Sequence, residues 1–200
     1  MMRVGITGGI GSGKTEVRNT LQRGGYTVLS ADDIAKSIAS SNPSVRKRIV
    51  RLLGPVAFRA DGTLNRPAIA SLVFGNRRKE RALNAIIHPE VLNEVRRRFR
   101  GLERKGHRVA FVEAALIFEA GMDQDLDVVV VVDAPREARI RRVLKRDGGS
   151  RRAVEKRMAA QWPSHRRNRK ADIVLRNTGS IRELRSKVKF LARLFKHIAG

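Results

Sequence analysis

A glycine-rich stretch close to the start of the chain limits the possible folds more than any other feature. It fits the pattern G-x-x-x-x-G-K-[ST] and consists of Gly8, Gly9, Ile10, Gly11, Ser12, Gly13, Lys14 and Thr15. The apolar run 4–7 precedes it, and a helical pattern follows it to residue 23. A strand that leads through glycines into a helix points successive backbone N–H groups into one concavity, where the positive helix end favours an anion. This context predicts a phosphate-binding loop rather than an ordinary strand-to-helix turn.

The side chains of this loop have defined roles in such a site. Lys14 would reach the β- and γ-phosphates of a bound nucleotide, and the hydroxyl of Thr15 would bind Mg²⁺. The glycines let the backbone approach the phosphates closely. We therefore expect a nucleoside triphosphate and Mg²⁺ at this loop.

Length and composition narrow the class of protein. The chain has 200 residues, enough for one α/β domain that carries a small lobe, and it contains no cysteine, which excludes disulfides and thiolate metal sites. Its longest apolar run, 128–132, is too short to span a bilayer, and no signal-peptide pattern opens the sequence. We expect a soluble, cytoplasmic monomer without a membrane partner.

The charge balance is strongly basic. Lys and Arg total 43 against 19 Asp and Glu, a formal net charge of +24 that attracts polyanions. Only 4% of the residues are aromatic, and neither an RNP1 nor a cysteine–histidine finger pattern is present. We therefore expect phosphate-rich ligands and general surface charge, and no specific nucleic-acid partner.

Five apolar runs alternate with helical patterns along the chain. The fourth run is five consecutive valines, which is typical of a strand buried on both faces. The expected strands are 3–7, 26–29, 109–112, 128–132 and 172–175. The expected helices are 15–23, 33–39, 43–53, 66–74, 77–105, 151–161 and those after 135 and 180. This alternation predicts a three-layer α/β fold, a doubly wound P-loop NTPase with a five-stranded parallel sheet.

Local signals predict several details of the helices. Pro89 is expected to break or kink the helix 77–105, and Pro135 to occupy the first position of its helix. Ser180 and Glu183 form a capping-box pattern at the start of the last helix. The inner face of that helix is expected to consist of Ile181, Leu184, Val188, Leu191 and Phe195.

The distribution of strands predicts an inserted lobe and a lid. Segment 41–106 has no strand pattern, so we expect a helical lobe there, inserted in a core of 1–40, 107–146 and 170–200. A lobe of this kind commonly holds a second substrate against a nucleotide. The basic segment 147–169 is expected to be a lid.

Arginines in the helix after residue 135 are candidate phosphate ligands. Arg139, Arg142 and Arg146 fall on the helix face opposite Ile140 and Val143, which predicts an outward basic row. Guanidinium groups bind phosphate in a bidentate manner, so we expect at least one of Arg142 and Arg146 to contact the nucleotide.

Two acids and one histidine are candidates for the second substrate. Asp32 and Asp33 follow the second expected strand, at the sheet edge where such folds bind their ligands, although either could simply cap the next helix. His88 lies at an expected helix boundary, where a histidine is structural as often as it is functional.

The order and spacing of these features resemble the dephospho-coenzyme A kinase family over nearly the whole chain. The matching segments are 4–15, 30–36, His88-Pro89, 116–119, Arg142 with 145–147, Gln161, 171–172 and Asn177. The resemblance implies transfer of the γ-phosphate of ATP, with Mg²⁺, to the ribose 3′-hydroxyl of dephospho-CoA, the last step of coenzyme A synthesis. It also implies that the lobe 41–106 binds CoA.

The resemblance assigns residues to this reaction. Asp32 would be the catalytic carboxylate and would act with Lys14 and Arg142. ATP would be bound by Gly9, Ile10, Gly11, Ser12, Gly13, Lys14, Thr15, Glu16, Arg146 and Asn177. Dephospho-CoA would be bound by Asp32, Lys36 and His88, and the metal by Thr15.

Some residues depart from the family pattern. Ser30 stands where the family has a first Asp, and Lys36 replaces a common Arg, which weakens bidentate phosphate contact. An acid and a proline that usually precede 116–119 are Glu113 and Ala115, which leaves open whether Glu113 joins the Mg²⁺ shell through water. The alternatives are a nucleoside or nucleotide monophosphate kinase and, from another class, a GTPase-like regulator or RNA-binding module. The segment 168–172 does not reproduce the N-K-x-D guanine motif.

Overall fold

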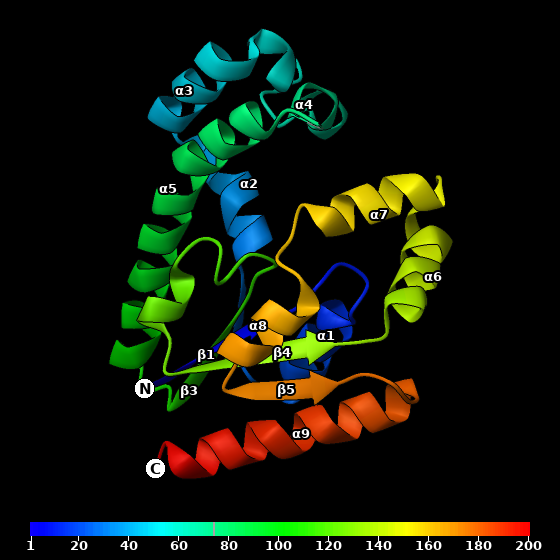
Figure 1. Cartoon of the computed structure of the whole chain (residues 1–200). Helices are drawn as coiled ribbons and strands as arrows, with labels where there is room; N and C mark the ends of the chain where they lie inside the picture. Colours follow the sequence, from blue (N-terminus) through cyan, green and yellow to red (C-terminus); the bar gives the residue numbers. More distant parts are fainter. Residues whose placement is uncertain (74) are drawn as a thin grey trace. The chain divides into compact units, whose positions relative to one another are not determined.

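A parallel five-stranded sheet forms the centre of the protein. The computed structural model describes residues 1–73 and 75–200, so the expected end of helix 66–74 lies outside the described residues. The strand order is β2-β3-β1-β4-β5, and the pairs β1–β3, β1–β4 and β4–β5 are parallel (Figure 1). The strands are β1 (Met2–Thr7), β2 (Val28–Ser30), β3 (Val109–Glu113), β4 (Val128–Asp133) and β5 (Ile173–Arg176). The predicted fold class is confirmed.

Helices cover both faces of the sheet. Side chains of α1 (Lys14–Arg23) and α9 (Ile181–Ile198) join alternate residues of the strands, such as Val130 and Val132, in one apolar core. The intervening Val129 and Val131 are also buried, and α8 (Ser164–Lys170) packs on β4 in front of the sheet in Figure 1. Burial on both faces explains why these strands are unbroken apolar runs.

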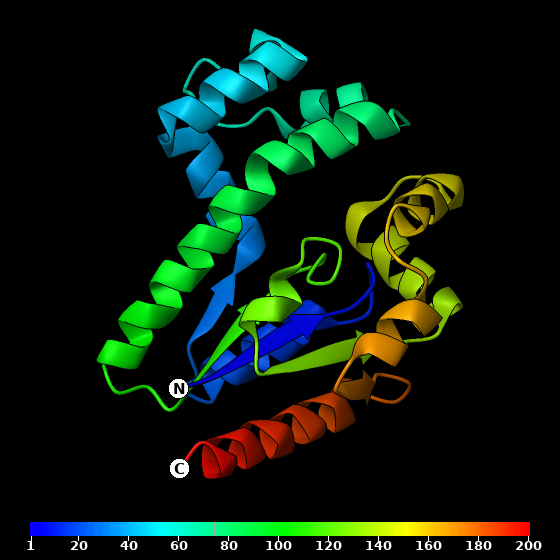
Figure 2. The same cartoon turned by 60° about the vertical axis from the view of Figure 1, so that its left-hand side comes forward.

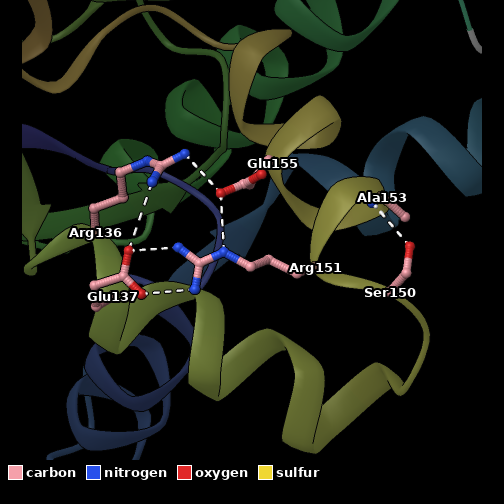
Figure 3. Close-up of polar contacts among 6 residues, drawn as sticks. All are labelled: Arg136, Glu137, Ser150, Arg151, Ala153 and Glu155. Carbon is pink, nitrogen blue, oxygen red and sulfur yellow. Dashed lines mark hydrogen bonds and ion pairs between the residues drawn. The ribbon is translucent and has the colours of Figure 1, made fainter.

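Two helices follow β4, and the second of them lies within the expected lid, 147–169. They are α6 (Arg136–Asp147) and α7 (Arg151–Ala159), and Ser150 caps α7 by accepting a hydrogen bond from the backbone N–H of Ala153 (Figure 3). Ion pairs join the two helices: Arg151 bonds Glu137 at 2.7 Å, and Arg136 bonds Glu155 at 2.9 Å (Figure 3).

The chain divides into two compact units. One unit is Met1–Leu29 with Phe99–Gly200, and the other is Ser30–Arg98. The second unit has its own apolar core, which includes Val45, Ile49 and Ile86. Its elements are α2 (Ala31–Ser41), α3 (Pro43–Leu53), the 3₁₀ helix η1 (Pro55–Ala57), α4 (Arg66–Val73) and most of α5 (Arg77–Arg104). Helix α2 therefore clusters with the lobe, whereas the sequence places the lobe's start at residue 41.

Three local predictions differ from the structure. Helix α5 is continuous through Pro89, so the expected break is absent, because the loss of one backbone donor does not by itself end a helix, while the kink stays a prediction. Pro135 is the N-cap of α6 and has ψ of 140°, so it precedes the first helical residue. Ile181 is 60% exposed, since it opens α9 and its Cβ points back beyond the packed face.

The remaining predictions for α9 hold. The capping box between Ser180 and Glu183 is present, and Leu184, Val188 and Phe195 are buried on the inner face, with Leu191 packed at its side. Figure 2, a second view of the protein, shows α9 (orange to red) lying along the sheet. In the part of the chain that the structure describes, no helix combines the length and apolar character needed to cross a bilayer.

Candidate functional site

The phosphate loop follows β1 at the carboxyl edge of the sheet. Gly13 has φ of 108°, a left-handed conformation that glycine adopts without strain, and it directly precedes α1. A Cβ at Gly9 would lie 2.0 Å from Nη2 of Arg139 and 2.8 Å from Nη2 of Arg167. Glycine at position 9 therefore permits two guanidinium groups to approach the loop backbone.

The polar side chains of the loop lie close to its backbone. Lys14 Nζ donates to the carbonyl oxygens of Gly8 at 2.8 Å and Gly9 at 3.4 Å, which holds the ammonium group over the loop. The Thr15 side chain is exposed, whereas the Ser12 hydroxyl is buried and has no hydrogen-bond partner among the described residues. A buried hydroxyl without a partner in this position can donate a hydrogen bond to a phosphate oxygen.

Asn177 supports the loop from beneath. Its side-chain amide is buried and donates to the Ser12 carbonyl oxygen at 2.8 Å, and its backbone N–H donates to the Asp133 carbonyl oxygen at 2.7 Å. The end of β5 is thereby joined to the loop and to the end of β4. Glu16, the last loop residue assigned from the sequence, turns outward and pairs with Arg185 at 2.7 Å, which lowers the pKa of the Glu16 carboxyl.

Arg139 is buried beside the loop, so its place in an outward basic row is wrong. The side chain is 5% exposed, with Nε donating to the Ile10 carbonyl oxygen at 2.9 Å and Nη1 to the Ser164 hydroxyl at 3.1 Å. Helix α6 lies close enough to the loop for this, since a Cβ at Gly11 would meet the backbone oxygen of Arg139 at 2.5 Å. The helical period alone could not reveal it, because the buried sector of α6 is wider than its apolar stripe.

The segment 161–167, named the strap here, holds the other side of Ile10. Gln161 Oε1 accepts a hydrogen bond from the Ile10 N–H at 2.8 Å. The strap is anchored by Trp162, whose backbone N–H donates to Glu119 Oε1 at 3.0 Å and whose ring stacks on Phe118. Both backbone groups of Ile10 are thus fixed by side chains from outside the loop. In the sequence, only the family resemblance points to Gln161.

A second buried arginine, Arg167 of the strap, lies next to Arg139. Arg167 is 2% exposed, donates to the Trp162 carbonyl oxygen, and shares the Ser164 hydroxyl with Arg139. Burial lowers the pKa of both arginines, and for Arg139 the charge of Arg167 lowers the pKa further, while Asp133 opposes these effects. Since the ordinary arginine pKa is far above neutrality, two cations remain beside the loop.

The two arginines singled out from the sequence differ in position. Arg142 is exposed and its Nη1 lies 3.5 Å from the Gly11 carbonyl oxygen, which places it at the loop. Arg146, one turn later, makes a bidentate contact with Asp147 at 2.6 and 3.0 Å. Arg157 of α7 bonds the same carboxylate at 2.9 Å, and the two guanidinium groups hold the pKa of Asp147 well below its usual range. The structure therefore brings Arg142 to the loop and pairs Arg146 with an acid.

Oxygen ligands suited to a hard cation lie at the same sheet edge. Glu113 ends β3, is buried, and lies 3.5 Å from Arg18 Nη1 at its Oε2 atom. The described residues include no group of three or more His, Cys, Asp or Glu that could hold a metal by themselves. The Thr15 hydroxyl and the Glu113 carboxylate are suitable donors for Mg²⁺, which is bound by few protein oxygens together with phosphate and water.

The remaining candidates lie in the unit Ser30–Arg98. Asp32 and Asp33 are exposed in the first turn of α2, and Ser30 caps that helix by accepting from the Asp33 N–H at 3.2 Å, so neither acid is the cap. Lys36 Nζ pairs with Asp33 at 2.5 Å. His88 is half-buried inside α5, not at a helix boundary.

Comparisons with known proteins give one consistent result. The family model described as dephospho-CoA kinase matches residues 2–183. A dephospho-CoA kinase of Corynebacterium efficiens is 36% identical over 199 residues, covering 99% of this chain and 100% of the relative. One from Chlorobaculum tepidum is 41% identical over 194 residues, covering 93% and 91%. A Thermus thermophilus crystal structure has a TM-score of 0.76 at 39% identity, covering 96% of this chain and 97% of that one.

Proposed function

Because this chain belongs to the dephospho-CoA kinase family, we propose that it transfers the γ-phosphoryl group of ATP to the ribose 3′-hydroxyl of dephospho-CoA, giving CoA and ADP. This reaction is the last step of coenzyme A biosynthesis. The observation that carries the proposal is a complete phosphate loop, fixed at Ile10 from both sides, in a chain that matches the family over nearly its whole length.

The phosphate loop would supply most of the rate enhancement. Phosphoryl transfer requires positioning and charge neutralisation more than covalent chemistry. The loop N–H groups and the Lys14 ammonium would bind the β- and γ-phosphates, and the buried Ser12 hydroxyl can donate there. The Thr15 hydroxyl would hold Mg²⁺, which when bound neutralises charge on these phosphates, and Glu113 would assist through water.

Basic side chains around the loop would complete the site. Arg142 already lies at Gly11 and would contact the transferred phosphoryl group. Arg146 would exchange its bidentate contact with Asp147 for one with a nucleotide phosphate, since both are oxyanions that match the guanidinium fork. Asn177 would act by holding the Ser12 carbonyl beneath the nucleotide.

The acceptor, dephospho-CoA, would be bound by the helical unit Ser30–Arg98. We assign Asp32 as the group that accepts or orients the proton of the 3′-hydroxyl, and its exposed position in the first turn of α2 supports this role. Lys36 and His88 would contact dephospho-CoA, and the lobe 41–106 would bind its pantetheine-bearing part. Segment 147–169 would be the lid, and the protein would act as a cytoplasmic monomer without a nucleic-acid partner.

Product analysis with a loop variant tests this proposal. The purified chain with ATP and Mg²⁺ is expected to convert dephospho-CoA to a product that mass spectrometry identifies as CoA. Lys14→Ala should abolish turnover because the variant lacks the cation at the β- and γ-phosphates, while circular dichroism remains that of the parent. Unchanged turnover of Lys14→Ala would show that the activity does not come from this loop.

A further inference from the structure

The outer face of α9 carries most of the exposed large apolar side chains of the protein. Among the described residues, four of the five such side chains lie on this helix, Ile181 being one of them. Phe190 is 66% exposed, Leu194 37% and Ile198 61%. These three residues are spaced four apart and form one line along the helix, named the apolar row here. Figures 1 and 2 show the sheet on one side of α9 only.

A line of cations runs beside the apolar row. The exposed residues Arg182, Lys189, Arg193 and Lys196 form this cation row, and none of them makes a hydrogen bond or ion pair within the described part of the chain. Glu183 is the single acid of α9, and it is used in the capping box. The charge of the cation row is therefore uncompensated.

Helix geometry places the two rows next to each other. Successive residues are separated by about 100°, so Arg193 and Phe190 lie about 60° apart around the axis. The buried residues Leu184, Val188 and Phe195 occupy the opposite side. From Phe190 to Ile198, the solvent side of α9 is thus divided into a cationic and an apolar half, the pattern of a helix that lies in the interface of a bilayer.

A groove between α1 and α9 borders the cation row. It has a volume of about 550 Å³, and Tyr26, Val188, Lys189, Ala192 and Arg193 are among its lining residues. Its other two arginines, Arg23 and Arg185, are already paired with Glu16. Lys189 and Arg193 therefore supply unpaired positive charge at the edge of this groove.

We propose that α9 docks this protein on an anionic lipid surface, with the apolar row among the acyl chains and the cation row on headgroup phosphates. A second copy fits less well, because two cation rows would meet, and three apolar side chains provide far less than the roughly 800 Å² per partner of a stable interface. RNA would engage the cations but leave the apolar row exposed to water. The proposal does not rest on the kinase reaction.

Vesicle binding tests the proposal with the full chain. We expect co-sedimentation with vesicles of equal phosphatidylcholine and phosphatidylglycerol, decreasing with salt, and none with phosphatidylcholine alone. Phe190→Ser with Ile198→Ser, and separately Lys189→Gln with Arg193→Gln, should each weaken binding by at least about tenfold. These side chains are exposed, so circular dichroism and thermal unfolding should stay those of the parent.

The control variants have the same changes on another exposed surface. Lys47→Gln with Arg51→Gln repeats the residue types and spacing on α3, and Val56→Ser removes the fifth exposed apolar side chain. Loss of vesicle binding in these controls equal to that in the α9 variants would overturn the proposal in favour of general surface charge. It would also be overturned by vesicle binding unchanged in the α9 variants. A dimer that Phe190→Ser with Ile198→Ser dissociates, without vesicle binding, would identify a second copy as the partner instead.

Discussion

Single residues far apart in the sequence determine the conformation of the phosphate loop. Ile10 receives one hydrogen bond from a side chain 129 positions away and donates another to one 151 positions away. The loop itself could be predicted, because its glycines, Lys14 and Thr15 are required at fixed spacings by phosphate chemistry. The contribution of Arg139 could not, because a charged residue inside a basic run predicts exposure, and only the packing of α6 against the loop buries it.

Arg139 gives a direct test of this support. In Arg139→Met the Ile10 carbonyl and the Ser164 hydroxyl lose their common donor, and bonds from charged donors are worth about 1.5–3 kcal/mol. We expect the KM for ATP to rise about tenfold or more, with a smaller change in the KM for dephospho-CoA. The matched control is Arg141→Met, exposed on the same helix. Steady-state kinetics and direct nucleotide binding check this, and a parental KM for ATP in Arg139→Met would refute the role.

The two adjacent acids of α2 give a second test. Asp32→Asn keeps shape but removes the proton acceptor, so kcat should fall on the order of 10²-fold while the KM for ATP changes little. Asp33→Asn loses the ion pair with Lys36 and should leave kcat nearly unchanged and cost at most about 1 kcal/mol of stability, because the pair is exposed and Ser30 provides the cap. Parallel kinetics decide between them: an inactive Asp33→Asn with an active Asp32→Asn would move the assignment by one residue.

The strands and most helices could be predicted from the sequence. The effects of proline on the helices, and the exposure of the first residue of α9, could not. Strands buried on both faces are runs of β-branched residues, and this pattern survives any tertiary context. Pro89, Pro135 and Ile181 depend on where a helix starts and what surrounds it, which local sequence does not specify. The ion pairs between α6 and α7 in Figure 3 are likewise tertiary contacts.

Ion pairs on α5 predict a pH dependence of stability. Arg97 and Arg98 bond Glu94 at 2.7 Å each and lower its pKa to about 2. Because the folded pKa is below the unfolded value of about 4.3, the stabilisation is complete above that value and is lost as the pH falls towards 2. Glu94→Gln should therefore lower the free energy of unfolding at pH 7 by about 1 kcal/mol or less, since both arginines are exposed. Urea unfolding at pH 7, 4 and 2.5 measures it; a deficit that grows on acidification would contradict this cause.

At the scale of the whole molecule, the basic composition is distributed over many exposed faces. Many arginines are paired with nearby acids. Glu94, Asp147 and Glu155, for example, each form ion pairs with arginine side chains. The net charge was visible in the sequence, but its uncompensated part on α9 required the structure. The division into two compact units was expected in kind, although α2 joins the helical unit through tertiary contacts, among them those with α3.

Acceptor preference tests whether dephospho-CoA is the substrate of this kinase. The values of kcat/KM for dephospho-CoA, AMP, adenosine and CMP should be measured with the same ATP and Mg²⁺ concentrations. We predict a large preference for dephospho-CoA, because contacts with the pantetheine-bearing part of the substrate help to orient the 3′-hydroxyl for transfer. Equal or faster turnover of AMP would contradict it and identify the protein as a nucleotide monophosphate kinase.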